Sequence, residues 1–152
     1  MAEYEDTIID VSKPNAGRVY DYLLGGNHNF DVDKHAGDKL LKMAPIASDY
    51  AKLTRWFLGV GIRRAVELGF TQFLDFASGL PTEDHIHENT PAGTKVIYSD
   101  IDSVTVDYGK DIIGENNIVK YVLCDASKPE KLLETDAIKT LFDLSYHKSM
   151  LI

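Results

Sequence analysis

The sequence predicts an α/β fold with a partial parallel sheet, the first half of a doubly wound one, and an N-terminal helical cap. Up to Gly69 the apolar residues recur at helical spacing. After it, short apolar segments alternate with helical ones, which is typical of βαβ units. With 152 residues, 44% of them hydrophobic, the chain has enough apolar side chains for one structural domain. We therefore expect a helical region at 1–69 and a Rossmann-like sheet region at 70–152.

The first two expected helices lie in the segment up to Met43. Ser12 is a suitable cap for the first helix, which carries Pro14 in its first turn. The Gly25-Gly26 pair ends this helix, because glycine adopts backbone angles that other residues avoid. The second helix is expected at about 32–43.

The third expected helix begins after Pro45 and ends at Gly69, which has the residue type of a left-handed cap. Its apolar residues step by three or four along one face, namely Tyr50, Leu53, Phe57 and Val60. We expect Trp56 and Phe57 to pack this helix against the sheet.

The sheet region is expected to begin with three strands joined by helices. The strands are predicted at about 72–76, 95–99 and 118–124. The helices are predicted at 83–89, at 103–113 and from 129–133. The last residues, 148–152, have the pattern of the opening of a fourth strand.

Charge and composition exclude several classes of protein. Lys and Arg total 16 and Asp and Glu total 24, which gives a net charge of −8. Such a chain is a poor candidate for binding nucleic acid or an anionic membrane. Cys124 is the single cysteine, so neither an intrachain disulfide framework nor a cysteine-based zinc site is expected. No apolar run could span a membrane and the first residues are acidic, so we expect a cytoplasmic protein.

Each of the three predicted strands ends in an acidic residue. Asp75, Asp100 and Asp125 stand at the sheet edge where doubly wound folds bind ligands. Asp100 could hold both ribose hydroxyls, Asp125 an exocyclic amine and Asp75 an ammonium group. A single aspartate after a strand is more often a turn residue, because its side chain bonds nearby backbone N–H groups. Three aspartates at the ends of three neighbouring strands favour a ligand site.

The turn after the first strand discriminates between nucleotide cofactors. The G-x-G-x-x-G fingerprint of dinucleotide binding is absent, and Pro81 removes a backbone donor. Asp75 would repel a pyrophosphate but suits a ligand with a positively charged amino-acid group. An NAD-binding domain is therefore the weaker hypothesis, and S-adenosylmethionine fits better.

Four segments of the sequence resemble a known family. FLDFASGLPT, followed by His87-Glu88, resembles the FLDIGTGLPT…VHE motif of a group of S-adenosylmethionine-dependent methyltransferases abundant in actinomycetes. SKPNAGRVYDYLLGGNHNFDVD is similar to the family's P-x-x-A-R-V-Y-D-Y-L-L-G-G-x-x-N-F-x-x-D. TRWFL resembles its N-R-x-F-L and VIYSDID its V-V-Y-V-D-N-D. The resemblance extends from about Ser12 to the end of the chain.

The resemblance implies a set of cofactor-binding residues. Asp75, Ala77 and Gly79 would line the methionine part, Asp100 would hold the ribose, and Asp125 with Ala126 would lie by the adenine. A lid over the cofactor would consist of Arg18, Tyr20, Asp21, Gly25, Gly26, Asn29 and Phe30. A packing role is the alternative for these lid residues, and Gly25-Gly26 could equally be a helix stop. No metal site is expected, and no catalytic residue is identified.

Two departures from the family pattern affect the functional prediction. Ala77 replaces a glycine, which costs about 1 kcal/mol if that position needs a positive φ. The chain is also expected to be truncated before strand 4, without the later strands that usually form the acceptor pocket. We therefore expect a homo-oligomer formed through the unpaired, apolar sheet edge.

Two functions remain open at this point. The first is a methyltransferase that binds S-adenosylmethionine and acts on an unknown, small-molecule acceptor. The second is a non-catalytic, truncated cofactor-binding module that works through an oligomer or a partner.

Overall fold

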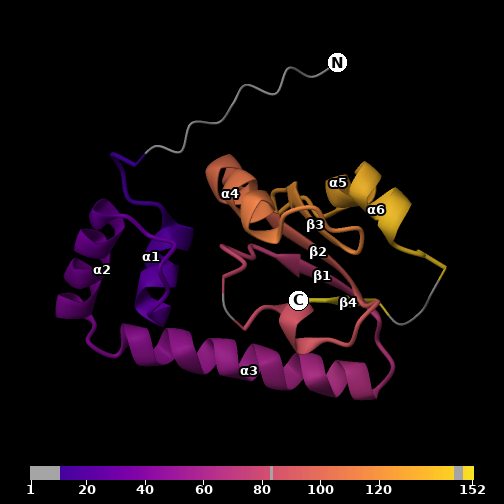
Figure 1. Cartoon of the computed structure of the whole chain (residues 1–152), viewed down its shortest axis with the longest axis horizontal. Helices are drawn as coiled ribbons and strands as arrows, with labels where there is room; N and C mark the ends of the chain where they lie inside the picture. The colour runs from indigo at the N-terminus through magenta and orange to yellow at the C-terminus, as the bar shows by residue number, and fades with distance from the viewer. Residues whose placement is uncertain (1–10, 83, 146–148) are drawn as a thin grey trace.

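A four-stranded parallel sheet, in the order β3-β2-β1-β4, forms the centre of the computed structural model (Figure 1). The structure describes residues 11–82, 84–145 and 149–152. Its strands are β1 (Gln72–Phe76), β2 (Lys95–Asp100), β3 (Val119–Leu123) and β4 (Ser149–Leu151). In the register of the sheet, Leu74 of β1 lies between Ile97 of β2 and Leu151 of β4. The chain therefore proceeds outwards from β1 to β3 and returns to the other side of β1, which makes the carboxyl end of β1 a topological switch point.

Helices cover both faces of this sheet, as the sequence predicts. Alternate side chains of a strand point to opposite faces, so Phe73 and Leu74 enter two different cores. Phe73 packs with Ile62 of a preceding helix and with Val106 of a helix that follows β2. Leu74 packs with Leu132 and Ile138, which follow β3. The helical elements are α1 (Ala16–Leu24), α2 (Asp31–Met43), α3 (Ala47–Glu67), the 3₁₀ turn η1 (Ile86–Asn89), α4 (Ser103–Ile113), α5 (Glu130–Leu133) and α6 (Asp136–Leu141).

The helical cap consists of α1, α2 and the first half of α3, with the sheet over the second half of α3 (Figure 1). The cap residue of α1 is Asn15 and not Ser12, because the Asn15 side chain accepts a hydrogen bond from the Arg18 backbone N–H at 3.1 Å. Asn15 also donates to Asp102 at the start of α4. The first helix thus begins where its cap can also bind the sheet region. Gly25 ends it with a left-handed φ of 91°.

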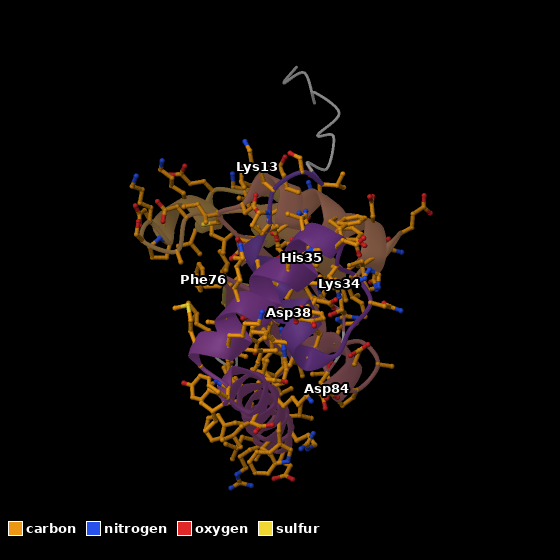
Figure 2. The ribbon with its side chains drawn as sticks, turned by 90° about the vertical axis from the view of Figure 1, so that its left-hand side faces the viewer. Lys13, Lys34, His35, Asp38, Phe76 and Asp84 are labelled. Carbon is orange, nitrogen blue, oxygen red and sulfur yellow. The ribbon has the colours of Figure 1, made fainter. Side chains whose placement is uncertain are left out.

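The prediction for the packing face of α3 was wrong. Trp56 and Phe57 are 60% and 68% exposed, and the other residues of the predicted apolar face are exposed as well. The buried face instead contains mostly small residues, namely Ala51, Arg55, Gly59, Ile62 and Ala65. Small side chains allow the helix to lie close to its neighbours, while the bulky stripe projects outwards. In Figure 2, side chains extend outwards from α3 at the bottom of the view.

Other predicted elements differ in extent. The helix expected at 83–89 is only the turn η1, and Glu83 lies outside the described residues. Helix α6 was not predicted at all. The opening of a fourth strand is confirmed as β4, although Lys148 lies outside the described residues. The backbone N–H of Ile152 donates to the Leu74 carbonyl at 2.9 Å, so the fourth strand already pairs with β1.

Candidate cofactor-binding site

A cavity of about 510 Å³ lies at the carboxyl ends of β1 and β2, between the sheet, α1 and α3. This is the edge of a doubly wound sheet at which ligands bind, and the volume is in the usual range for small-molecule sites. The turn after β1 forms its floor. The residues that line it are Ala16, Gly17, Tyr20, Thr54, Arg55, Leu58, Asp75, Phe76, Ala77, Ser78, Gly79, Asp100 and Ile152.

The turn at 77–79 has an unusual backbone conformation. Ala77 and Gly79 have positive φ angles of 52° and 65°, a region that disfavours side chains with a Cβ. The hydroxyl of Ser78 donates to the Asp75 carbonyl at 3.0 Å, and Tyr121 donates its O–H to the Gly79 carbonyl at 2.5 Å. These bonds hold the turn in place, so Ala77 keeps its strained conformation. A Cβ added at Gly79 would meet no atom within 4 Å.

Two of the three strand-end aspartates line this cavity. Asp75 is 6% exposed, and burial raises the pKa of its carboxyl to about 6, against the opposing effect of the Arg55 charge. Asp100 is half-buried, and its carboxylate accepts the backbone N–H groups of Gly79 at 3.1 Å and Asp102 at 3.0 Å. Asp100 therefore fixes the turn and still presents lone pairs to a ligand.

Arg55 of α3 is a wall residue that the sequence analysis missed. Only 9% of it is exposed, and its Nη1 donates to Nδ1 of His85 at 3.3 Å. His85 is fully buried, and burial together with the Arg55 charge lowers the pKa of its imidazole to about 3. The sequence does contain a signal for its inward position. Arg55 lies four residues after Ala51 and four before Gly59, which places it on one helical face with two small residues.

The sequence of the chain matches that of a known protein family. The family described as S-adenosyl methyltransferase matches residues 2–151. The chain belongs to this family. The resemblance predicted from the sequence motifs is thereby confirmed, and with it the methyltransferase class of the fold.

Two solved structures resemble this chain over nearly its whole length. One, from Thermobifida fusca YX, is provisionally described as a methyltransferase; it shares 32% identity with a TM-score of 0.84, over 99% of this chain and 57% of that one. The other is a DUF574 family protein from Streptomyces avermitilis MA-4680, with 26% identity and a TM-score of 0.83 over 95% of this chain and 57% of that one. This chain thus spans little more than half the length of each. A comparison with curated proteins finds no match.

The third strand-end aspartate of this methyltransferase fold does not line the cavity. Asp125 follows β3, and its carboxylate accepts the backbone N–H of Ser127 at 2.9 Å. Its hydrogen bonds to Ser127, together with nearby lysines, lower the pKa of its carboxyl. Ala126 is exposed. Their placement by the adenine stays a prediction, and in this structure Asp125 acts as a turn residue.

The predicted lid residues separate into two groups. Tyr20 lines the cavity, and its hydroxyl donates to the Ala51 carbonyl of α3 at 3.3 Å. Arg18 instead forms an ion pair of 2.7 Å with Asp33 of α2, with both side chains buried, and its guanidinium lies 5.3 Å from the Phe30 ring centre. In this structure these contacts join α1 to α2.

The remaining predicted lid residues surround Asp21, which is 2% exposed. The Asn29 amide donates to its carboxylate at 2.8 Å, as does the backbone N–H of His28. A side chain at Gly26 would collide with this carboxylate, since its Cβ would lie 2.2 Å from Oδ1. Gly26 therefore has a packing reason to be glycine, whereas Gly25 has a conformational one, its left-handed φ of 91° at the end of α1. A lid role for the pair stays a prediction.

Within residues 11–82, 84–145 and 149–152, no group of three His, Cys, Asp or Glu side chains has metal-binding geometry. No helix in this part of the chain is long and apolar enough to cross a bilayer.

Proposed function

We propose that this chain binds S-adenosylmethionine in the cavity beside the β1 turn and belongs to an enzyme that methylates a small-molecule acceptor. The observation that carries the proposal is the lining of that cavity. It combines the buried carboxylate of Asp75 with that of Asp100 and an open backbone position at Gly79. The family match supports the same reading.

Each of these residues has a separate part in the proposed binding. Asp75 attracts the ammonium of the amino-acid group, because its buried carboxylate gains a positive partner. Asp100 accepts hydrogen bonds from the ribose hydroxyls through lone pairs that Gly79 and Asp102 leave free. The space in front of Gly79 allows the ligand to approach the backbone.

The proposed chemistry requires positioning more than acid or base catalysis. When bound, S-adenosylmethionine supplies a sulfonium methyl group as the electrophile. The task of the chain is then to hold the cofactor in one orientation and to exclude water from the reacting atoms. The net charge of −8 disfavours a nucleic acid as acceptor, which supports a small molecule.

The first test is isothermal titration of the purified chain with S-adenosylmethionine, with NAD as the control ligand. We expect micromolar binding of S-adenosylmethionine alone. Absence of heat with S-adenosylmethionine, from a protein shown to be folded, would contradict the proposal. Binding without methyl transfer to any acceptor would favour the alternative of a non-catalytic module.

A matched pair of variants tests the site itself. Asp100→Asn, inside the cavity, is expected to lower the affinity for S-adenosylmethionine about 10-fold or more. The reason is that charge-assisted hydrogen bonds to the ribose are lost. Asp125→Asn changes the same residue type at the end of the neighbouring strand, outside the cavity. Weakened adenosine binding in Asp125→Asn would support the predicted adenine role, and unchanged binding would make Asp125 a turn residue only.

A further inference from the structure

The buried guanidinium of Arg55 has no counter-ion in the part of the chain that the structure describes. Arg55 lines the cavity and is 9% exposed. Among the described residues it forms no ion pair, and its Nε, buried from solvent, has no hydrogen-bond partner. A buried, unpaired charge with an unused donor is expensive. Its presence in the wall of a cavity indicates that an anion belongs there.

Two neutral groups hold Arg55 without neutralising it. The carbonyl of Leu80 can only accept, so Nε2 of His85 donates to it at 2.5 Å. Nδ1 of His85 then carries a lone pair, which accepts a hydrogen bond from Nη1 of Arg55. The ring of Tyr20 lies on another side, with its centre 5.4 Å from Cζ of Arg55. His85 and Tyr20 are therefore positioning residues that fix the guanidinium and leave its charge available.

The same cavity holds a buried carboxylate that has no ion-pair partner within residues 11–82, 84–145 and 149–152. Asp75 and Arg55 both line it, and the Arg55 charge acts to lower the pKa of Asp75. Among the described residues the two do not form an ion pair with each other. A ligand group that carries an ammonium and a carboxylate on one carbon would satisfy both at once.

We propose that Arg55 is the receptor for the α-carboxylate of the ligand's amino-acid group while Asp75 binds its ammonium, so that the site selects a zwitterion. This inference rests on the proposed function, because it assumes that the adenosyl ligand occupies this cavity. The inference adds a rule for ligand specificity. Nucleosides that lack the carboxylate should bind more weakly than S-adenosylmethionine, even when their sugar and base contacts are the same. Lysine cannot replace Arg55 fully, since an ammonium cannot contact His85 and a carboxylate with the same planar geometry.

The experiment compares four ligands by titration: S-adenosylmethionine, S-adenosylhomocysteine, decarboxylated S-adenosylmethionine and 5′-methylthioadenosine. The wild-type chain is expected to bind S-adenosylmethionine about 10- to 100-fold more tightly than its decarboxylated form, the range expected for one charge-assisted contact. Arg55→Gln is expected to remove that preference. Its affinity for 5′-methylthioadenosine, which has no amino-acid group, should remain within about 2-fold of the wild type.

The matched control is Arg63→Gln. Arg63 lies two turns further along α3, is exposed, and donates to Asn89 at 3.0 Å outside the cavity. The Arg63→Gln variant should bind all four ligands with the same affinities as the wild type. The wild-type comparison needs no variant, so the inference can be tested even if Arg55→Gln fails to fold.

The outcomes separate the inference from the function on which it rests. Wild-type chain that binds none of the four ligands would overturn the proposed function. Wild-type chain that binds S-adenosylmethionine and its decarboxylated form equally well would overturn the inference alone. So would an Arg55→Gln variant that loses 5′-methylthioadenosine as strongly as S-adenosylmethionine, because Arg55 would then be a structural residue of the cavity wall.

Discussion

At the scale of single residues, Ala77 shows how this chain departs from its family. Its φ of 52° is in the left-handed region, where a Cβ is strained. The family motif has glycine at this position. The sequence alone therefore predicts a cost for Ala77 only if the position needs a positive φ. The turn keeps its geometry through Ser78, Asp100 and Tyr121, which compensate for the unfavourable residue.

Ala77→Gly should stabilise the protein. Relief of the left-handed strain outweighs the extra flexibility of the unfolded chain, and we expect the free energy of unfolding to rise by about 0.5–1 kcal/mol. Urea denaturation measures this as a shift in midpoint at constant slope. Ala92→Gly, in an exposed turn without a positive φ, is the control and should lower stability slightly. A loss of stability in Ala77→Gly would mean that the turn is not strained.

Asp75 should make the stability of the free protein fall as pH rises. Its folded pKa of about 6 lies above the value of about 4 in an unfolded chain. The folded state therefore binds the proton more tightly, and its contribution is complete below pH ~4 and lost as pH rises through ~6. Asp75→Asn removes this loss, so above pH ~6 the variant should be the more stable protein by up to about 3 kcal/mol.

Denaturation from acidic to neutral pH, in wild-type and Asp75→Asn chains, measures this difference. Asp111→Asn, an exposed aspartate on α4, is the control and should follow the wild type. Ligand binding should have the opposite slope, because the proposed ammonium contact needs an ionised Asp75 and so strengthens as pH rises through about 6. An Asp75→Asn curve parallel to the wild type would show that the carboxylate is not penalised by burial.

At the scale of elements, the strands were the easiest part to predict from sequence. The segment 72–76 forms β1 as predicted, because a short apolar run between glycines has few other conformations. Helix α6 was missed, since its six residues are too few to show a helical period. The packing face of α3 was predicted wrongly, because the most apolar stripe is normally the buried one.

The contact between α1 and α2 depends on one buried ion pair. Arg18 and Asp33 are 1% and 0% exposed and 2.7 Å apart. Burial alone would raise the pKa of Asp33, but Arg18 and two backbone N–H donors lower it overall. Removal of either partner leaves the other charged and buried, so Asp33→Ala should lower the free energy of unfolding by about 3–5 kcal/mol.

The Arg18→Met, Asp33→Ala double variant should lose less stability than the sum of the single variants, because no unpaired charge remains. Lys34→Ala is the matched control. It breaks the exposed Lys34–Asp31 pair of 3.2 Å on the outer side of α2, where Figure 2 labels Lys34. This exposed pair should contribute less than about 1 kcal/mol. Additive losses in a thermodynamic cycle would show that Arg18 and Asp33 do not stabilise each other.

At the scale of the whole molecule, two of the three aspartates predicted from the sequence line the cavity, while Arg55 of its wall was not among the predicted residues. Asp75 and Asp100 were predictable because parallel strands bring their carboxyl ends to one edge. Arg55 was harder to predict, because the face of α3 that turns inwards is the one with small residues, Ala51 and Gly59, and not the apolar stripe. Asp125 was predicted by the same rule, but it does not line the cavity and its carboxylate accepts the backbone N–H of Ser127, so its adenine role stays a prediction.

The exposed face of α3 bears on the oligomeric state. Ile46, Tyr50, Leu53, Trp56 and Phe57 are each 59–70% exposed. A second, apolar cavity of about 250 Å³ connects this face to Met150 and Ile152 at β4, whose outer edge is unpaired among the described residues. Exposed apolar side chains gathered on one face are typical of contact surfaces, and a free strand edge is a template for pairing.

We propose that a second copy of the chain covers this continuous surface, as the sequence analysis expected for the sheet edge. One self-complementary patch suffices for a two-fold dimer, and a strand edge can pair with its own copy. Sedimentation at micromolar concentrations should therefore show a dimer. Trp56→Lys should shift the chain to monomer, because burying a lysine in an apolar contact is unfavourable. Leu133→Lys, at an equally apolar, 51% exposed position on α5, should not. A wild-type chain that is monomeric at every concentration would show that no second copy covers α3.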